Sequence, residues 1–272
     1  MDLNGILQHR VKTVKKDLVW QFGNREDGVI EFAGLVDGGI IEVGYFYGTD
    51  KPKNILVISS QVGCAVGCFF CPMGSARGRD KFKRNLTAEE MFEQVVLMLQ
   101  IAKEYSFDIE NIEHKITFAK AGEPLLNPFI FSGIEMLGRL GFSLKLSTIF
   151  PRGTQERFEE IVKFIQTYHK PVQLQVSLVS TVEAIREGSA RMKLASFKEI
   201  SEAGKLWKYH DNFCRKINLS LMMAGEAPFD FDAAQRYFPP DTFRFRLRLY
   251  IPNENGESHD LRAVSCERYE EI

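Results

Sequence analysis

The pattern of apolar and polar positions divides the chain into two parts that are built differently. Residues 17 to about 50 contain three apolar runs of strand length. The turn-forming pairs Asp27-Gly28 and Gly38-Gly39 separate these runs, and such pairs are typical of tight connections between strands. The pattern therefore predicts a small antiparallel β extension over residues 1–53.

From Asn54 onward, short apolar runs alternate with amphipathic stretches, which is typical of repeated β-α units. The predicted strands lie at 54–60, 115–119, 144–149, 172–178, 216–223 and 243–251. One predicted helix begins at 87–90 (TAEE), which has the sequence of a capping box. The other predicted helices lie at about 129–140, 154–168 and 181–208, with a short one after Asp230.

Six β-α repeats are too few to close an eight-stranded barrel. Parallel strands joined by right-handed crossovers favour an α/β fold, an open six-stranded (β/α)6 partial TIM-type barrel over residues 54–252. Ligands of such sheets bind at the carboxyl ends of the strands. Residues 253–272 would form a C-terminal tail that could cap the active site.

The composition and charge of the chain are typical of an ordinary globular protein. The chain is 44% hydrophobic and 26% charged, with a net charge of −1, which argues against a dedicated nucleic-acid binder. No apolar run approaches the roughly 18 residues of a membrane span, and the start lacks the pattern of a secretion signal. We therefore expect a cytoplasmic protein without a membrane partner.

Three cysteines, Cys64, Cys68 and Cys71, stand within eight residues directly after the strand predicted at 54–60. Four-iron clusters usually take four cysteine ligands, so three would leave one iron open to a ligand that is not protein. A structural zinc site needs four ligands. Only Cys214 and Cys266 remain, and they are far apart. A non-enzymatic iron–sulfur or zinc protein stays an alternative.

The C-x3-C-x2-C spacing, with Phe70 before the last cysteine, resembles the signature of the radical S-adenosylmethionine (SAM) superfamily. Residues 59–64 (SSQVGC), 84–87 (RNLT), 122–127 (GEPLLN) and 146–148 (LST) further resemble the branch that methylates C-2 or C-8 of adenine in RNA. This similarity covers about residues 17–255. It implies a [4Fe–4S] cluster on the three cysteines, with SAM bound to the open iron.

The resemblance also implies a set of SAM-contacting residues: Phe70, Gly122, Glu123, Ser147, Ser177 and Asn253, with Asn255 as an alternative to Asn253. Gly122 and Glu123 would bind the amino group of SAM, the two serines its ribose or carboxylate, and Phe70 would lie near its adenine. The serines could equally be hydroxyls that cap the strand ends.

The chain departs from that branch where methyl transfer would occur. The branch uses a methyl-carrying cysteine in a longer C-terminal tail and a resolving cysteine before the barrel, but here no cysteine precedes Cys64. We also expect the chain to lack the N-terminal RNA-binding domain of that branch. Lys120 and Val179 replace residues typical of the branch. Cys266 is the remaining candidate for a catalytic thiol.

We therefore expect a radical SAM enzyme that cleaves SAM reductively to a 5′-deoxyadenosyl radical, which then attacks an unactivated C–H bond of a small-molecule or nucleotide-like substrate. The cofactor supplies such chemistry while the protein orients and shields the reactants. A flavodoxin or ferredoxin would supply the electron. RNA is a less favoured partner, and an RNA adenine methyltransferase is the alternative function.

Overall fold

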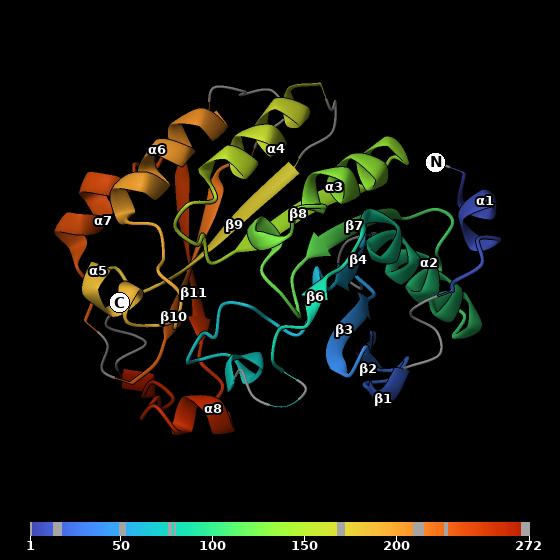
Figure 1. Cartoon of the computed structure of the whole chain (residues 1–272), viewed down its shortest axis with the longest axis horizontal. Helices are drawn as coiled ribbons and strands as arrows, with labels where there is room; N and C mark the ends of the chain where they lie inside the picture. Colours follow the sequence, from blue (N-terminus) through green and yellow to red (C-terminus); the bar gives the residue numbers. More distant parts are fainter. Residues whose placement is uncertain are drawn as a thin grey trace.

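The computed structural model describes residues 2–12, 18–48, 53–75, 78, 80–167, 172–208, 215–225 and 228–267 of the 272-residue chain. It is built on one nine-stranded sheet with the strand order β1-β2-β3-β4-β7-β8-β9-β10-β11 (Figure 1). These strands are β1 (Leu18–Phe22), β2 (Val29–Val36), β3 (Gly39–Phe46), β4 (Lys53–Ile58), β7 (Glu113–Phe118), β8 (Ser143–Thr148), β9 (Val172–Val179), β10 (Ile217–Met223) and β11 (Phe243–Leu249).

The sheet is mixed, and its two parts follow the division seen in the sequence. Strands β1 to β4 pair antiparallel, whereas β4, β7, β8, β9, β10 and β11 run parallel in chain order. The expectation of an α/β fold is confirmed. We expected a sheet of six strands, but the sheet has nine. The three N-terminal strands join it because β3 pairs with β4, with Gly44 opposite Val57 and Phe46 opposite Ile55. This pairing satisfies backbone groups that an uncovered β4 edge would leave exposed.

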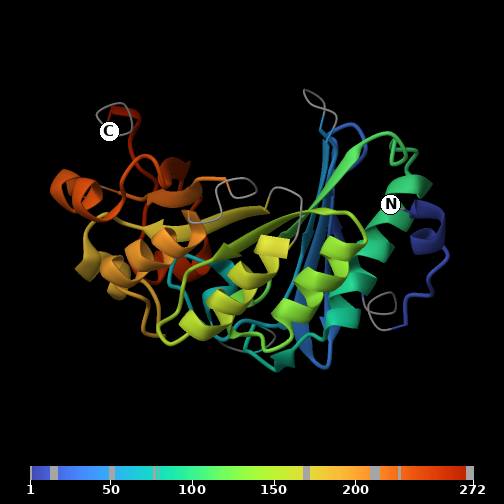
Figure 2. The same cartoon turned by 90° about the horizontal axis from the view of Figure 1, so that it is seen from above.

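The helices are α1 (Leu3–Leu7), α2 (Ala88–Glu104), α3 (Ile130–Arg139), α4 (Gln155–Thr167), α5 (Glu183–Glu187), α6 (Phe197–Lys208), α7 (Phe231–Tyr237) and α8 (Glu254–Glu257). A row of them covers one face of the sheet, whereas α8 contacts the short 3-10 helix Pro72–Ser75 of the cysteine segment. Helices α2, α3, α4, α6 and α7 contact one another in that order, and Figures 1 and 2 show them as a row beside the sheet. In the described part of the chain, no helix combines the length and apolar character that a membrane crossing requires.

The connection after β9 differs from the expectation. The helix predicted over 181–208 is two helices, α5 and α6, with an extended segment between them. We call residues 188–195 the β9 connector. Its Ala190 forms a β-bridge with Cys68, and its Leu194 forms one with Pro151. The connector is not helical because its backbone pairs with two loops at isolated positions, and a continuous helix could not do so.

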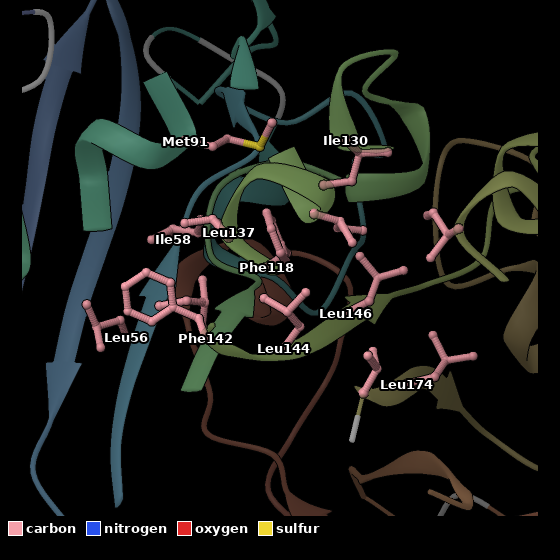
Figure 3. Close-up of a cluster of buried hydrophobic side chains, with 14 of the residues drawn as sticks. Leu56, Ile58, Met91, Phe118, Ile130, Leu137, Phe142, Leu144, Leu146 and Leu174 are labelled. Carbon is pink, nitrogen blue, oxygen red and sulfur yellow. The ribbon is translucent and has the colours of Figure 1, made fainter. Parts of the chain in front are cut away.

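The apolar core lies between the sheet and the helices (Figure 3). Along each parallel strand, residues alternate between this core and the opposite face of the sheet. Fully buried core positions include Leu56 of β4, Phe118 of β7 and Leu174 of β9. The opposite face carries polar residues, so the sheet presents an apolar side to the helices and a polar side to its concave interior.

Helix α2 fixes the end of β4, where the cysteine segment begins. Thr87 and Glu90 form the expected capping box at its start. One turn later, the buried side chain of Gln94 accepts a hydrogen bond from Ser59 N (2.8 Å) and donates one to Ser59 O (3.0 Å). Gln94 therefore satisfies both backbone groups of a residue that is itself fully buried.

We expect Gln94→Leu to lower the free energy of unfolding by about 2–4 kcal/mol, because it leaves the buried N–H and C=O of Ser59 without partners. Chemical denaturation measures the change. Gln100→Leu is the control on the same helix, since Gln100 is half-buried and bonds to Leu7 O and His9 O near the N-terminus. Equal losses in the two variants would contradict the special role of Gln94.

Candidate functional site

The candidate site is a cavity of about 420 Å³ at the carboxyl ends of the parallel strands. All three cysteines of the triplet line it. Five of the residues expected to contact SAM line it too: Phe70, Gly122, Glu123, Ser147 and Ser177. The fold thus gathers segments that are up to about a hundred residues apart in the sequence. Contact of these residues with SAM stays a prediction.

The cysteine loop is a compact turn joined to β4. The Cys71 N–H donates to Cys68 O (3.2 Å), and the Gly74 N–H donates to Cys71 O (2.8 Å). Burial raises the pKa of all three thiols, that of Cys71 to about 12. The thiols are therefore neutral at pH 7, and a metal centre that binds them would displace their protons.

The loop fits an extended cluster. The described residues contain no group of three or more His, Cys, Asp or Glu side chains arranged around one ion position. In a four-iron cluster each cysteine binds a different iron, so the thiols of such a site stand apart around a shared cavity. Cys64, Cys68 and Cys71 all line one cavity, and they could together hold a four-iron cluster.

The C-terminal tail holds the cysteine loop from its other side. The amide nitrogen Nδ2 of Asn255 lies 2.9–3.1 Å from the carbonyl oxygens of Cys68, Phe69 and Cys71. The Asn253 Nδ2 donates to Phe70 O (3.0 Å), and its Oδ1 accepts from Gly256 N to cap α8. Figure 1 shows α8 beside the cyan cysteine segment. Both asparagines thus bind the loop backbone, and Asn253 does not line the cysteine cavity.

Gly74 is required by this close approach. A Cβ atom on Gly74 would lie 1.7 Å from Cys68 O and 2.8 Å from Asn255 Nδ2. No side chain fits at that separation. The loop can therefore pack against the tail only with glycine at this position.

The two diagnostic motifs bind each other directly. Ser59 Oγ accepts a hydrogen bond from Ala121 N (3.2 Å), and Gln61 Oε1 accepts one from Glu123 N (3.1 Å). Between these two bonds, Gly122 has a φ of +99°, and a Cβ atom there would lie 2.6 Å from Gln61 Cβ. The residues flanking the cysteines therefore dictate the glycine of the GEPLLN motif, which explains why the motifs occur together.

Glu123 organises the end of β8. Its carboxylate accepts hydrogen bonds from Leu125 N (3.0 Å), Thr148 Oγ1 (2.5 Å) and Ile149 N (2.9 Å). Burial raises its pKa to about 7, while these three donors favour the charged form. The carboxylate that would meet the SAM amino group thus also sets the position of the LST segment.

Arg186 is a buried cation that sequence reasoning missed. Its side chain is fully buried and donates to Ile149 O (2.6 Å), Ser177 O (2.9 Å) and Ala195 O (3.2 Å). These carbonyls lie after β8, in β9 and at the end of the β9 connector. Burial lowers its pKa to about 10, while the nearby Cys68 and Glu123 oppose this shift. An arginine inside a predicted helix carries no spacing signal, so the sequence gives no warning of this role.

The atypical residues have structural explanations. The Lys120 Nζ pairs with Glu31 Oε1 of β2 at 2.5 Å, which links the N-terminal strands to the cavity rim. Val179 has a φ of +70° at the end of β9, a conformation that is rare for a β-branched residue and often marks functional sites. Cys266 is exposed and does not line the cavity, and Cys214 lies outside the described residues.

Comparisons with known proteins identify relatives of the chain. No family model matches the chain. A probable dual-specificity RNA methyltransferase RlmN from Flavobacterium psychrophilum is 32% identical over 254 residues, which is 89% of this chain and 68% of that protein. One of the same name from Trichodesmium erythraeum is 35% identical over 56% of this chain. The chain spans about 40% of the length of that protein and similar shares of several others.

Among solved structures, the fold is similar to a radical SAM methyltransferase from Sphaerobacter thermophilus, with a TM-score of 0.68. The similarity covers 93% of this chain and 72% of that protein at 22% sequence identity. It shows a shared fold.

We expect Gly74→Ala to lose most of the iron that the protein retains after anaerobic reconstitution, because the added methyl group forces the cysteine loop away from Asn255. Iron and sulfide content and the melting temperature measure the effect. Gly188→Ala is the control, since a Cβ there would lie 3.3 Å from its nearest neighbour, Ala184 O. Full iron retention in Gly74→Ala would show that the loop does not depend on this contact.

Proposed function

The chain belongs to the RlmN family of the radical SAM superfamily, and on this basis we propose that it cleaves SAM reductively and uses the product to attack a C–H bond of a second molecule. One observation supports this above all: Cys64, Cys68, Cys71 and the Gly122–Glu123 pair line the same cavity. A [4Fe–4S] cluster and SAM are the cofactors of this superfamily. We also propose that the six parallel strands form the open partial barrel that encloses them.

In this proposal each part of the cavity has a separate task. When bound, the cluster and SAM supply the electron and the 5′-deoxyadenosyl radical that abstracts hydrogen. Cys64, Cys68 and Cys71 hold the cluster, and Glu123 orients the amino group of SAM. Ser147 and Ser177 stand at the ends of β8 and β9, within reach of its ribose or carboxylate.

The surrounding elements would exclude water and keep the reactants in place. The tail residues Asn253 and Asn255 bind the cysteine loop, and the β9 connector bonds to it through Arg191 N and Gly67 O. A reactive radical needs its target at near-attack distance and shielded from solvent. A low-potential donor such as flavodoxin or ferredoxin would supply the electron, and a reducing cytoplasm would suit the cluster.

The substrate we favour is a small or nucleotide-like molecule. A second cavity of about 430 Å³ adjoins the first and shares Phe70, Ser177 and Arg248 with it. Cavities of this size accommodate small ligands. The two together offer room for SAM and one further molecule.

RNA methylation is the second candidate, and the names of the aligned relatives favour it. The similarity to the Flavobacterium protein extends over 89% of the chain. In this candidate, Cys266 would carry the methyl group. Its exposure is compatible with a tail that moves toward the cavity during the reaction.

After anaerobic reconstitution with iron, sulfide, a reductant and SAM, we expect the protein to form 5′-deoxyadenosine. Cys68→Ala should abolish this product, because two cysteines cannot hold the cluster. Cys214→Ala is the control and should retain it. Chromatography of the products measures both, and absence of 5′-deoxyadenosine from the unmodified chain would refute the proposal.

The two candidates differ in a second product. With an adenine-containing RNA stem-loop, methyl transfer would yield S-adenosylhomocysteine beside 5′-deoxyadenosine. If Cys266 carries the methyl group, Cys266→Ala would form no S-adenosylhomocysteine and would not methylate the RNA. We expect instead that Cys266→Ala and Cys214→Ala behave like the unmodified chain and form 5′-deoxyadenosine alone. Methylated adenine in the RNA, detected by mass spectrometry, would decide for the second candidate.

A further inference from the structure

The concave face of the parallel strands carries a group of cations that neither the cluster nor SAM explains. Lys145 stands on β8 between the buried Leu144 and Leu146, so its side chain is on the face opposite the helices. The same alternation places Lys115 of β7 and both Arg246 and Arg248 of β11 on that face. We call these four residues the inner-face cations.

Strand register confirms that they share one side of the sheet. Lys145 of β8 is opposite Thr117 of β7, two residues beyond Lys115. At the other end, Arg246 is opposite Ser220, and Ser220 is opposite Ser177. The apolar residues between these positions pack against the helices.

The inner-face cations lack acidic partners in the described part of the chain. Lys145 Nζ donates to the neutral Gln175 Oε1 (2.8 Å). The carboxylate of Glu113, near Lys115, pairs with Lys53 (2.8 Å). Among the described residues, Arg246 and Arg248 have no ion pair or side-chain hydrogen bond.

These positive charges repel one another. Burial, together with the charges of Arg248 and Arg246, lowers the pKa of Lys145 to about 8. Burial, together with the charges of Lys53 and Lys145, lowers the pKa of Lys115 to about 8, although Glu113 opposes the shift. A bound anion would relieve both the repulsion and the poor solvation of these ammonium groups.

The cations also reach the candidate site. Lys145 and Arg248 line the cavity that contains the three cysteines, and Arg248 lines the adjoining cavity as well. An anion held between these two side chains would therefore lie beside the molecule bound at the cysteines.

We propose that Lys145 and Arg248, supported by Lys115 and Arg246, form a subsite for the phosphate group of a small phosphorylated substrate. This inference rests on the proposed function, since it assigns the class of molecule that the radical attacks. A phosphate carries up to two charges and three acceptor oxygens, so it matches several cations better than the single carboxylate of SAM does. The cavity that Lys145 and Arg248 line has a volume of about 420 Å³, which suits a small phosphorylated ligand.

The test is calorimetric titration of the full, cluster-free chain with inorganic pyrophosphate. We expect saturable binding that weakens as salt is added. Lys145→Met and Arg248→Met should each raise the dissociation constant about tenfold, because each removes a charge-assisted contact. Lys145→Arg should retain binding. The control Lys205→Met, on the outer surface of α6 where Lys205 pairs with Glu202, should leave it unchanged.

Three results would overturn the inference. The first is an absence of pyrophosphate binding, or equal binding by the unmodified chain and by Lys145→Met and Arg248→Met. The second is that the reconstituted Lys145→Met variant binds SAM more weakly while its pyrophosphate binding is unchanged. That result would assign the cations to the SAM carboxylate. The third is binding of a short single-stranded RNA that Lys145→Met weakens and that pyrophosphate does not displace.

Failure of this inference is distinguishable from failure of the proposed function. Pyrophosphate binding is measured without cluster or SAM, and 5′-deoxyadenosine formation is measured without pyrophosphate. A chain that cleaves SAM but binds no pyrophosphate keeps its proposed function and loses only the phosphate subsite. Melting temperatures of the methionine variants verify that they are folded, and loss of like charges should not lower them.

Discussion

The backbone contact between residues 59–61 and residues 121–123 is the constraint on which the site depends. Ser59 and Gln61 bind the backbone of Ala121 and Glu123, and helix α2 holds Ser59 through Gln94. The same contact fixes where the cysteine loop leaves β4 and where the Glu123 carboxylate enters the cavity. Because all these groups are buried, losing one bond leaves a polar atom unsatisfied, and the arrangement is therefore strongly specified.

A second set of contacts supports the site at the carboxyl ends of β8 and β9. The β9 connector bridges Cys68 and Pro151, and the buried Arg186 binds carbonyls after β8 and in β9. A cation without a carboxylate partner among its described hydrogen bonds is costly to bury. Its four backbone partners offset that cost and hold two strand ends at a fixed separation, which is what a cavity needs to keep its shape.

The sequence predicts what depends on local patterns. Apolar periodicity located the strands, and the capping box located the start of α2, because each reflects nearby residues alone. Three features depend instead on partners that are distant in the sequence: the pairing of β3 with β4, the break between α5 and α6, and the burial of Arg186. The cysteine spacing pointed to the cavity, but the contacts of Asn255 link residues more than 180 positions apart and have no local signature. The inner-face cations became visible only once strand register placed them together.

Strand β11 is an edge of the nine-stranded sheet, and its three arginines, Arg244, Arg246 and Arg248, alternate with apolar residues. An exposed edge strand can recruit strands of other molecules and so seed aggregates, and charged side chains along it oppose such pairing. Leu249 and Ile251, which follow, are 62% and 81% exposed. Arg248, which also lines the cavity, therefore belongs to a row of charges that opposes pairing of this edge with strands of other molecules.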